Sequence, residues 1–452
     1  MSDFMQTILS SELKPVISDA IPILHRLLLR MGSFPYQNDP MSFLNFEILR
    51  IACAYINNDI YNIHDNLDFQ VIFFQSLGSF NRISRLRNNT EHTPRDKDDD
   101  EHLEHALWCV ERRSRSHYNP AMVFRGQPNP PPSHFPSSWS RKLDQPIPTG
   151  ESRSFLRLML VLNLDSTGFD ISSLAAWSQQ AEEVVDCMLA AFRPGPEGIS
   201  WDYFVEALAD MVCDSYSCVL TGRIVANSLQ RTLLRGFAQL LGPLLWNELF
   251  EGDAVPSDMR QAVYKQHVRF ARRKVLPSAY ILNPPVLSQL DIMLPPIIIQ
   301  NISISWSTRE THTDFSSLES HIQEQKTPTI LLVSGRNQNQ QRILAGIFDG
   351  KKYPYKISEK PFMFQLAPLH RIYRPLPSEA EDFMVLGHSE DSTMDMLRYQ
   401  SGKACLFFSE NSGHFSVQDD PALDEEFHVD AVEIYQCDIE KEAEHGIFDR
   451  DT

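Results

Sequence analysis

The chain has 452 residues, of which 42% are hydrophobic, and this size and composition predict two or three globular domains with a sizeable buried core. Lys and Arg together number 41 against 59 Asp and Glu, which gives a formal net charge of -18 at pH 7. Such a charge repels phosphate backbones and anionic lipid surfaces over much of the molecule. The composition therefore argues against a disordered chain and against direct binding of nucleic acid.

Cysteine usage and hydropathy indicate the compartment. The 7 cysteines are odd in number and lack the regular spacing of a small disulfide-bonded domain, which favours a reducing environment. The first residues lack a basic segment followed by an apolar core, so we expect no secretory signal. Apolar runs such as 158–164 are far shorter than the roughly 20 residues that span a bilayer. We therefore expect a cytoplasmic protein without a transmembrane segment.

Residues 1–118 are predicted to form an N-terminal helical region. Apolar side chains recur at helical spacing at Leu24, Leu27, Leu28 and Met31, and Gly32 and Pro35 end this helix. Similar patterns predict helices at 43–56, 67–80 and 101–113. The segment 119–150 is rich in proline, which lacks a backbone N–H and does not join a helix or a central strand. We interpret it as a linker.

A second helical region is predicted over residues 151–285, because apolar positions again recur three or four residues apart. Its helices are expected at 154–163, 181–192, 200–213, 226–250 and 258–275. Paired prolines at 284–285 and 295–296 are interpreted as the exit from this region toward β structure.

Residues 286–440 show short apolar runs bounded by Gly, Pro, Asn and Asp at intervals of about ten residues, a pattern typical of an antiparallel sandwich. Strands are expected at 329–333, 343–348, 362–366, 372–374, 383–386, 394–399, 404–409, 415–418 and 429–435, after one helix at 316–324. Residues 441–452 form an acidic tail. The predicted fold class is α+β, a helical N-terminal half followed by an antiparallel two-sheet β-sandwich.

Three segments resemble ligand-binding motifs but depart from them. Residues 346–351 resemble a phosphate-binding loop with the glycines one residue too close together, and we interpret Asp349 and Gly350 as a tight hairpin turn. A helical face at 102–109 offers two His and one Cys but no fourth zinc ligand. The calcium-loop-like segment 165–176 contains Asp165 and Asp170 but lacks the closing Glu.

Candidates for catalysis and for binding are also few. No nucleophile elbow or cysteine-protease motif is present, and the enzyme candidates considered are Cys405 and the pair His388 and His414 on the loops of the sandwich. Cys213 and Cys218 have no second cysteine pair and are read as free thiols. Carboxylates between 419 and 426 are read as a solvated loop, and the basic cluster at 269–274 either docks an acidic partner or is a polar helix face.

Several segments resemble the TLDc domain, the module shared with oxidation resistance proteins, and more closely the restriction of telomere capping protein 5 family. The resemblance is carried by residues 31–36, 46–49 and 76–82 in the first half, and by 328–333, 344–346 and 362–368 in the second. It departs at 399–406, where Gly402 is the only glycine of a stretch that is glycine-rich in many TLDc domains.

The resemblance implies a fold of two antiparallel sheets with flanking helices, preceded by regions related to degenerate EF-hands. It implies binding to other proteins rather than turnover. TLDc proteins are associated with resistance to oxidative stress and with binding the peripheral sector of the vacuolar proton-pumping ATPase, whose assembly they influence. The link to telomere capping in the family name reflects a phenotype.

We therefore expect a non-enzymatic regulatory protein, with no catalytic, cofactor-binding or metal-binding residues, whose partner is the peripheral sector of the proton pump. Two alternatives stay open. One is a hydrolase or redox enzyme that uses Cys405, His388 or His414 on the loops of the sandwich. The other is a calcium-responsive scaffold that acts through Asp165 and Asp170. The oligomeric state, the contact surface and the packing of the helical regions do not follow from the sequence.

Overall fold

The computed structural model describes residues 18–32, 52, 73–74, 76–78, 146–166, 177–211, 280–294, 298–299, 302–309, 317–325, 327–350, 361–374, 397–401, 403–418 and 420–437. The chain divides into two compact units. Unit 1 comprises Met1–Ser178, Phe192–Leu208 and Cys218–Ala271. Unit 2 comprises Gln179–Ala191, Ala209–Ser217 and Arg272–Thr452.

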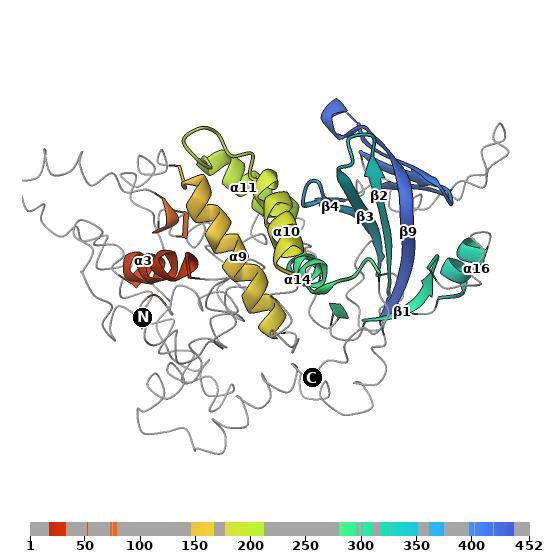
Figure 1. Ribbon diagram of the computed structural model, residues 1–452, viewed down its shortest axis with the longest axis horizontal. Helices are drawn as coiled ribbons and strands as arrows, with labels where there is room; N and C mark the ends of the chain where they lie inside the picture. Colours follow the sequence, from red (N-terminus) through yellow and green to blue (C-terminus); the bar gives the residue numbers. More distant parts are fainter. Residues whose placement is uncertain are drawn as a thin grey trace, which may run out of the picture. The chain divides into compact units, whose positions relative to one another are not determined.

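Unit 1 is helical in its described part. Helix α3 (Ala20–Gly32) packs against α9 (Thr149–Ser166), and both confirm helices predicted from apolar periodicity (Figure 1). The predicted helix at 200–213 is α11 (Trp201–Met211). Aromatic rings from distant parts of the sequence meet in the core of this unit, namely Phe73, Phe74, Phe155, Phe192, Trp201 and Phe204.

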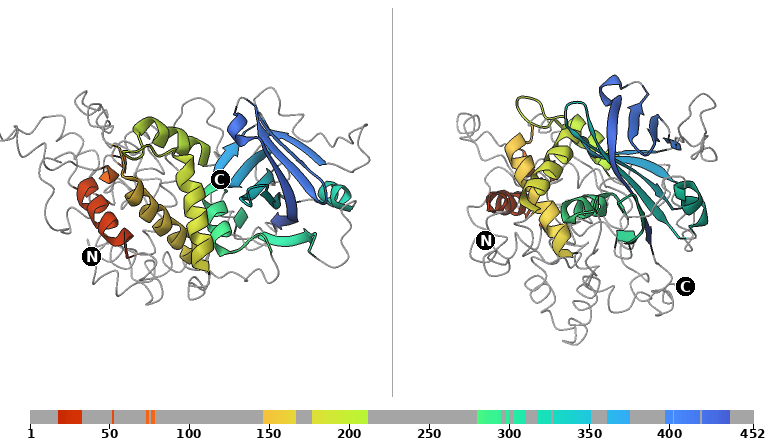
Figure 2. Two further views of the ribbon diagram at one scale, coloured as in Figure 1. Left: turned by 45° about the horizontal axis from the view of Figure 1, so that its top comes forward. Right: turned by 45° about the vertical axis from the view of Figure 1, so that its right-hand side comes forward.

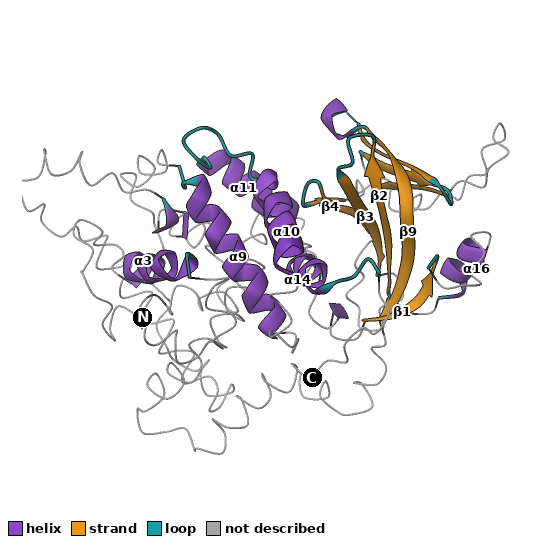
Figure 3. Ribbon diagram, in the orientation of Figure 1, coloured by secondary structure: helices purple, strands orange, loops and turns teal. Residues whose placement is uncertain are grey.

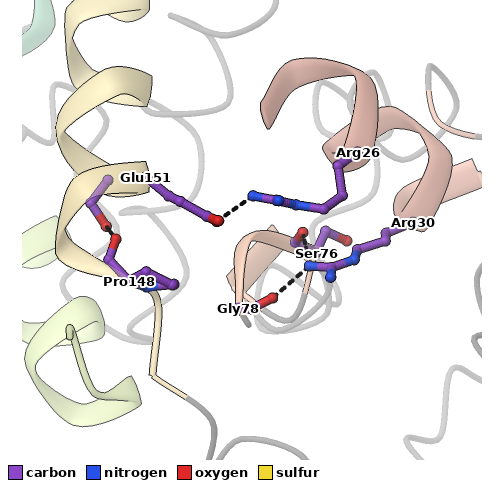
Figure 4. Close-up of polar contacts among 7 residues, drawn as sticks. Arg26, Arg30, Ser76, Gly78, Pro148 and Glu151 are labelled. Atoms are coloured by element: carbon purple, nitrogen blue, oxygen red, sulfur yellow. Dashed lines mark hydrogen bonds and ion pairs between the residues drawn. The ribbon is translucent and has the colours of Figure 1, made fainter. Parts of the chain in front are cut away.

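Arg30 on α3 joins two segments of unit 1. Its guanidinium donates to the carbonyl of Ser76 at 2.9 Å and to that of Gly78, where the short helical segment around residues 73–77 ends (Figure 4). Carbonyls at a helix end lack partners within the helix and carry partial negative charge, so a cation is favoured there. Burial lowers the pKa of Arg30 to about 10, so the side chain stays charged at neutral pH. Neighbouring Arg26 pairs with Glu151 on α9.

Unit 2 contains helix α14 (Pro284–Met293), which the sequence analysis did not predict. The side chain of Asn283 caps it by accepting from the backbone N–H of Val286 at 3.0 Å. Pro284 and Pro285 occupy the first positions of the helix, where the missing N–H of proline has no intrahelical partner to lose. The interpretation of this proline pair as an exit from helical structure was therefore wrong. The predicted helix at 181–192 is present as α10 (Ser178–Ala191).

The strands that the structure describes in unit 2 form one antiparallel sheet of 9 strands (Figure 3). Along the sheet the order is β5-β4-β3-β2-β9-β8-β7-β6, and β1 pairs with β9 beside this path. The strands are β1 (Ile302–Ser307), β2 (Thr329–Asn337), β3 (Arg342–Asp349), β4 (Phe362–Ala367), β5 (Arg371–Tyr373), β6 (Leu397–Ser401), β7 (Ala404–Phe408), β8 (Ser412–Val417) and β9 (Glu425–Cys437). The described strands are thus joined in one sheet, whereas the sequence analysis expected two separate ones.

The long strand β9 is the reason for this continuity. One of its edges pairs with β2 from Phe427 to Gln436. Its other edge pairs with β8 near its start and with β1 near its end. A strand of this length belongs to both halves of the sheet, so the halves remain hydrogen-bonded to each other. The helix predicted at 316–324 is α16 (Ser317–Glu324), which lies next to β1 (Figure 1).

The sheet curls so that its two end strands approach each other. The hydroxyl of Ser401 on β6 donates to the carbonyl of Tyr373 on β5 at 2.7 Å, and the ring of Tyr373 lies 5.5 Å from that of Phe415 on β8. Figure 2 shows the strands of the second half, in blue, turning away from β2 and β3. Side chains from all nine strands enclose one hydrophobic core, with Leu318 and Ile322 of α16 packed against it. We call the side of the sheet toward this core the inner face.

Eight of the nine predicted strands have a counterpart in the described part of the chain, and the ninth, at 383–386, lies outside it. The helices predicted at 101–113, 226–250 and 258–275 also lie outside. Of those predicted at 43–56 and 67–80, the structure describes residue 52 and residues 73–74 and 76–78, and 73–74 and 76–77 are helical. The predicted tight hairpin at Asp349 and Gly350 was wrong, because Phe348 pairs with Phe362 and the connection is much longer. None of the helices that the structure describes combines the length and apolar character that crossing a bilayer requires.

Candidate interaction surface

Glu433 on β9 is the most deeply buried carboxylate that the structure describes, with 0% of its surface exposed. Its oxygens accept hydrogen bonds from the backbone N–H groups of Tyr280 at 2.8 Å and Ile281 at 2.9 Å. The hydroxyls of Ser307 and Tyr435 also donate to it. A buried charge is tolerated when several donors replace its water shell, and four donors do so here.

The arrangement around Glu433 is structural. The two backbone donors belong to the segment just before α14, so the carboxylate holds the start of this helix against the sheet. Burial, together with the negative charge of Glu433, raises the pKa of Tyr435 far above its usual range. Tyr435 therefore stays protonated over the physiological range and is not poised for proton transfer.

A second buried polar group, His370, lies in the turn between β4 and β5. Its backbone N–H donates to the carbonyl of Cys187 on α10 at 3.1 Å, and its Nε2 lies 3.3 Å from the carbonyl oxygen of Met211. Burial lowers the pKa of His370 to about 4, so the ring is neutral at pH 7. The neighbouring Arg371 pairs with Asp210 at 2.9 Å. These contacts attach the two helices to the edge of the sheet.

The sulfur of Cys187 is also unsuited to chemistry. Burial raises the pKa of its thiol to about 12, so almost none of it is thiolate at neutral pH. Among the described residues, the most deeply buried ionisable groups thus serve packing and alignment.

The outer face of strands β6, β7 and β8 is different, because it is open to solvent. Along β6 and β7 buried residues alternate with exposed or half-buried ones, the pattern of a sheet with one covered and one open face. The open positions are Arg398 and Gln400 on β6, Cys405 and Phe407 on β7, and His414 and Ser416 on β8. Their inward neighbours, such as Tyr399, Leu406 and Phe415, belong to the core.

Three of these positions and one residue of β9 form a row across the strands. The register places Arg398 opposite Phe407, Phe407 opposite His414, and His414 opposite Glu426. The guanidinium of Arg398 lies over the Phe407 ring at 5.1 Å from its centroid. The rings of Phe407 and His414 are stacked with centroids 5.9 Å apart. We call Arg398, Phe407, His414 and Glu426 the outer row.

The outer row is polar at its ends and aromatic in the middle. At its acidic end His414 also contacts the carboxylate of Asp424, whose side chain is 59% exposed. Within the described part of the chain, neither Arg398 nor Glu426 takes part in an ion pair. Unpaired charges beside a half-exposed aromatic ring are features of protein contact surfaces, where aromatic residues and Arg supply much of the binding energy.

The enzyme candidates from the sequence analysis can now be placed. Cys405 lies on the same open face, opposite Gln400 and Ser416, and His414 is opposite Phe407 two residues farther along β7. His414 binds Asp424 and stacks on Phe407 rather than contacting Cys405. His388 lies outside the described residues. No pair of these residues is brought into contact by the described structure.

The remaining candidates are placed as follows. Of the acidic group at 419–426, the described members include Asp420, before a short 3-10 helix (Pro421–Leu423), and Glu425, which accepts from the side chain of Asn337 at 3.0 Å. Asp165 lies in the last turn of α9. The other candidates lie outside the described residues, namely Asp170, the possible zinc ligands at 102–109, Cys213, Cys218 and the basic cluster at 269–274. Four residues described above were not predicted from the sequence as site residues, namely Arg398, Phe407, Glu433 and His370.

The family model described as the TLDc domain matches residues 276–438, which include α14, α16 and all nine strands. No curated protein matched the chain.

Proposed function

We propose that the chain, whose residues 276–438 match the family model of the TLDc domain, is a non-enzymatic regulatory protein that acts by binding other proteins. The partner that the family resemblance suggests is the peripheral sector of the vacuolar proton-pumping ATPase, whose assembly the protein would influence. We further propose that the protein is cytoplasmic and has a role in resistance to oxidative stress. The same resemblance suggests that it is a member of the restriction of telomere capping protein 5 family and that its N-terminal helices are related to EF-hands.

The observation that carries this proposal is the outer row. It joins two stacked rings with a guanidinium and a carboxylate that have no ion-pair partner among the described residues, on a sheet face that is open to solvent. By contrast, Glu433 and His370 are buried and occupied by backbone groups. The accessible chemistry of the domain is therefore that of a contact surface.

Co-purification of the tagged full-length chain under gentle conditions tests the proposal. We expect subunits of the peripheral sector to co-purify with the wild-type chain and to be lost with Phe407→Ser, which removes the ring at the centre of the outer row. Tyr203→Ser is the matched control, because Tyr203 is also an exposed aromatic residue, 42% exposed, but lies in unit 1. Repeated absence of pump subunits from the wild-type sample would rule out this partner.

A further inference from the structure

We infer that the outer row also binds a second copy of this chain, face to face about a two-fold axis. This inference rests on the proposal that the open face is a protein-binding surface, and it names one occupant of that face.

The charge pattern of the row is self-complementary. Arg398 carries a positive charge at one end, Glu426 carries a negative charge at the other, and the aromatic rings of Phe407 and His414 lie between them. A two-fold axis through the middle of the row, parallel to the strands, exchanges its ends. Arg398 of one copy then faces Glu426 of the other, and Phe407 faces His414, so each contact occurs twice.

The two charges at the ends of the row have no ion-pair partner among the residues that the structure describes. Arg398 is exposed and bonds to the neutral side chain of Gln400 at 3.4 Å, and Glu426 is exposed on β9. Neither is neutralised by a described residue of its own chain. Facing a second copy supplies each with an opposite charge, whereas a uniformly acidic or basic partner would satisfy one end and repel the other.

The size of the face sets the strength of the association. Adjacent strands are about 4.8 Å apart, so the row spans about 14 Å, and five residues along each strand cover about 17 Å. Such a face is smaller than the roughly 800 Å² that each partner of a standard interface buries. We therefore expect a transient dimer with a dissociation constant of about 10 μM to 1 mM, weakened by added salt because part of the attraction is ionic.

Charge exchange tests this arrangement. The full-length chain is studied by sedimentation equilibrium across that concentration range at low and high salt. We expect Arg398→Glu alone and Glu426→Arg alone each to weaken dimerisation at least about tenfold, because each places like charges opposite each other twice per dimer. The double variant Arg398→Glu with Glu426→Arg is expected to recover the wild-type constant. Glu410→Arg, an equal change of charge at an exposed residue between β7 and β8, is the control and leaves dimerisation within about threefold.

The outcomes separate this inference from the proposed function. A wild-type chain that is monomeric at all concentrations, or a double variant that stays as weak as the single ones, overturns the inference. If pump subunits still co-purify in that case and are lost with Phe407→Ser, the proposed function stands without it. If the double variant restores a dimer but no pump subunit ever co-purifies, the inference stands and the proposed partner falls. Far-UV circular dichroism of each variant confirms that the fold is retained.

Discussion

At the scale of single residues, Glu433 shows how a buried charge fixes a helix on a sheet. Its carboxylate accepts from two consecutive backbone N–H groups that lie more than 150 residues earlier in the chain. Hydrogen bonds to charged groups contribute about 1.5–3 kcal/mol each, and a group left unpaired after its partner is removed adds a desolvation cost. The attachment of α14 therefore depends strongly on this one side chain.

We predict that Glu433→Gln lowers the free energy of unfolding by about 3 kcal/mol, because the amide places a donor against donors and carries no charge. Urea denaturation followed by circular dichroism measures the change. The matched control is Glu426→Gln on the same strand, which is exposed and should stay within about 0.5 kcal/mol of the wild type. Equal effects of the two substitutions would contradict the structural role of Glu433.

His370 predicts a pH dependence of stability. Burial lowers the pKa of His370 from its ordinary value of 6.5 to about 4, so on acidification the unfolded chain takes up a proton before the folded chain does. The stabilising effect of keeping the ring neutral is complete above pH 6.5 and is lost as the pH falls toward 4. Between pH 7 and pH 5, the protonation of this residue in the unfolded chain should lower the free energy of unfolding by about 2 kcal/mol.

Replacement by Gln, which keeps a donor but does not titrate, isolates this effect. When the pH falls from 7 to 5, we expect the free energy of unfolding of His370→Gln to decrease by about 2 kcal/mol less than that of the wild type. Urea denaturation at both pH values measures these free energies. His428→Gln, the same replacement at a histidine that is exposed on β9, is the control for the substitution itself. Parallel pH profiles of the wild type and His370→Gln would show that His370 is not protected from protonation by the fold.

At the scale of elements, glycine positions decide how closely the strands approach. A Cβ atom at Gly335 on β2 would lie 2.1 Å from the carbonyl oxygen of His428 and 2.5 Å from the Phe427 ring. The first contact is with backbone of the paired strand β9, at the point where the register between β2 and β9 shifts. Only a residue without a side chain fits this irregularity.

Gly335→Ala should therefore destabilise the protein by about 2–3 kcal/mol, because the strands must separate to admit the methyl group. The control is Gly150→Ala in α9, where nothing lies within 4 Å of the added Cβ. There Ala should leave stability unchanged or raise it by up to about 1 kcal/mol, since Ala is favoured over Gly in helices. Thermal unfolding measures the stability of both variants. If Gly335→Ala were as stable as Gly150→Ala, the register between β2 and β9 at Gly335 would be wrong.

The same scale shows what the sequence can predict. Apolar periodicity located α3, α9, α10 and α11, because that pattern is a local property of the chain. The start of α14 was missed because prolines were read as breakers, although Asn283 before them is a strong capping residue. Strand β1 was also missed, although Ile302, Ile304 and Trp306 alternate with serines in a strand-like pattern.

Pairing between distant segments was beyond such reasoning. The donors to Glu433 come from residues 280–281, and the outer row arises only when the registers of four strands are combined. A lone glutamate inside the apolar run Val432 to Tyr435 was the one local signal for the buried carboxylate. Phe407 gave no such signal, because its exposure depends on which face of the sheet the core covers.

At the scale of the whole molecule, unit 2 extends beyond the region matched by the family model. The match covers 276–438, but unit 2 also includes Gln179–Ala191 and Ala209–Ser217. These segments contact the edge of the sheet, where His370 donates to Cys187 and Arg371 pairs with Asp210. The edge formed by β4 and β5 thus depends on residues more than 150 positions earlier, whereas β9 is held by β1, β2 and β8.

Hydrogen exchange measured by mass spectrometry tests this dependence. In a fragment of residues 276–438, we expect peptides from 361–374 to exchange at least about tenfold faster than in the full-length chain. The reason is that the amide of His370 loses its acceptor, the carbonyl of Cys187, and the edge of the sheet is no longer covered by the earlier segments. Peptides from 425–437, at the centre of the sheet, should keep most of their protection because all their strand partners remain. Uniform loss of protection would show that the sheet needs the earlier segments to fold, and unchanged exchange at 361–374 would show that they contribute nothing to its edge.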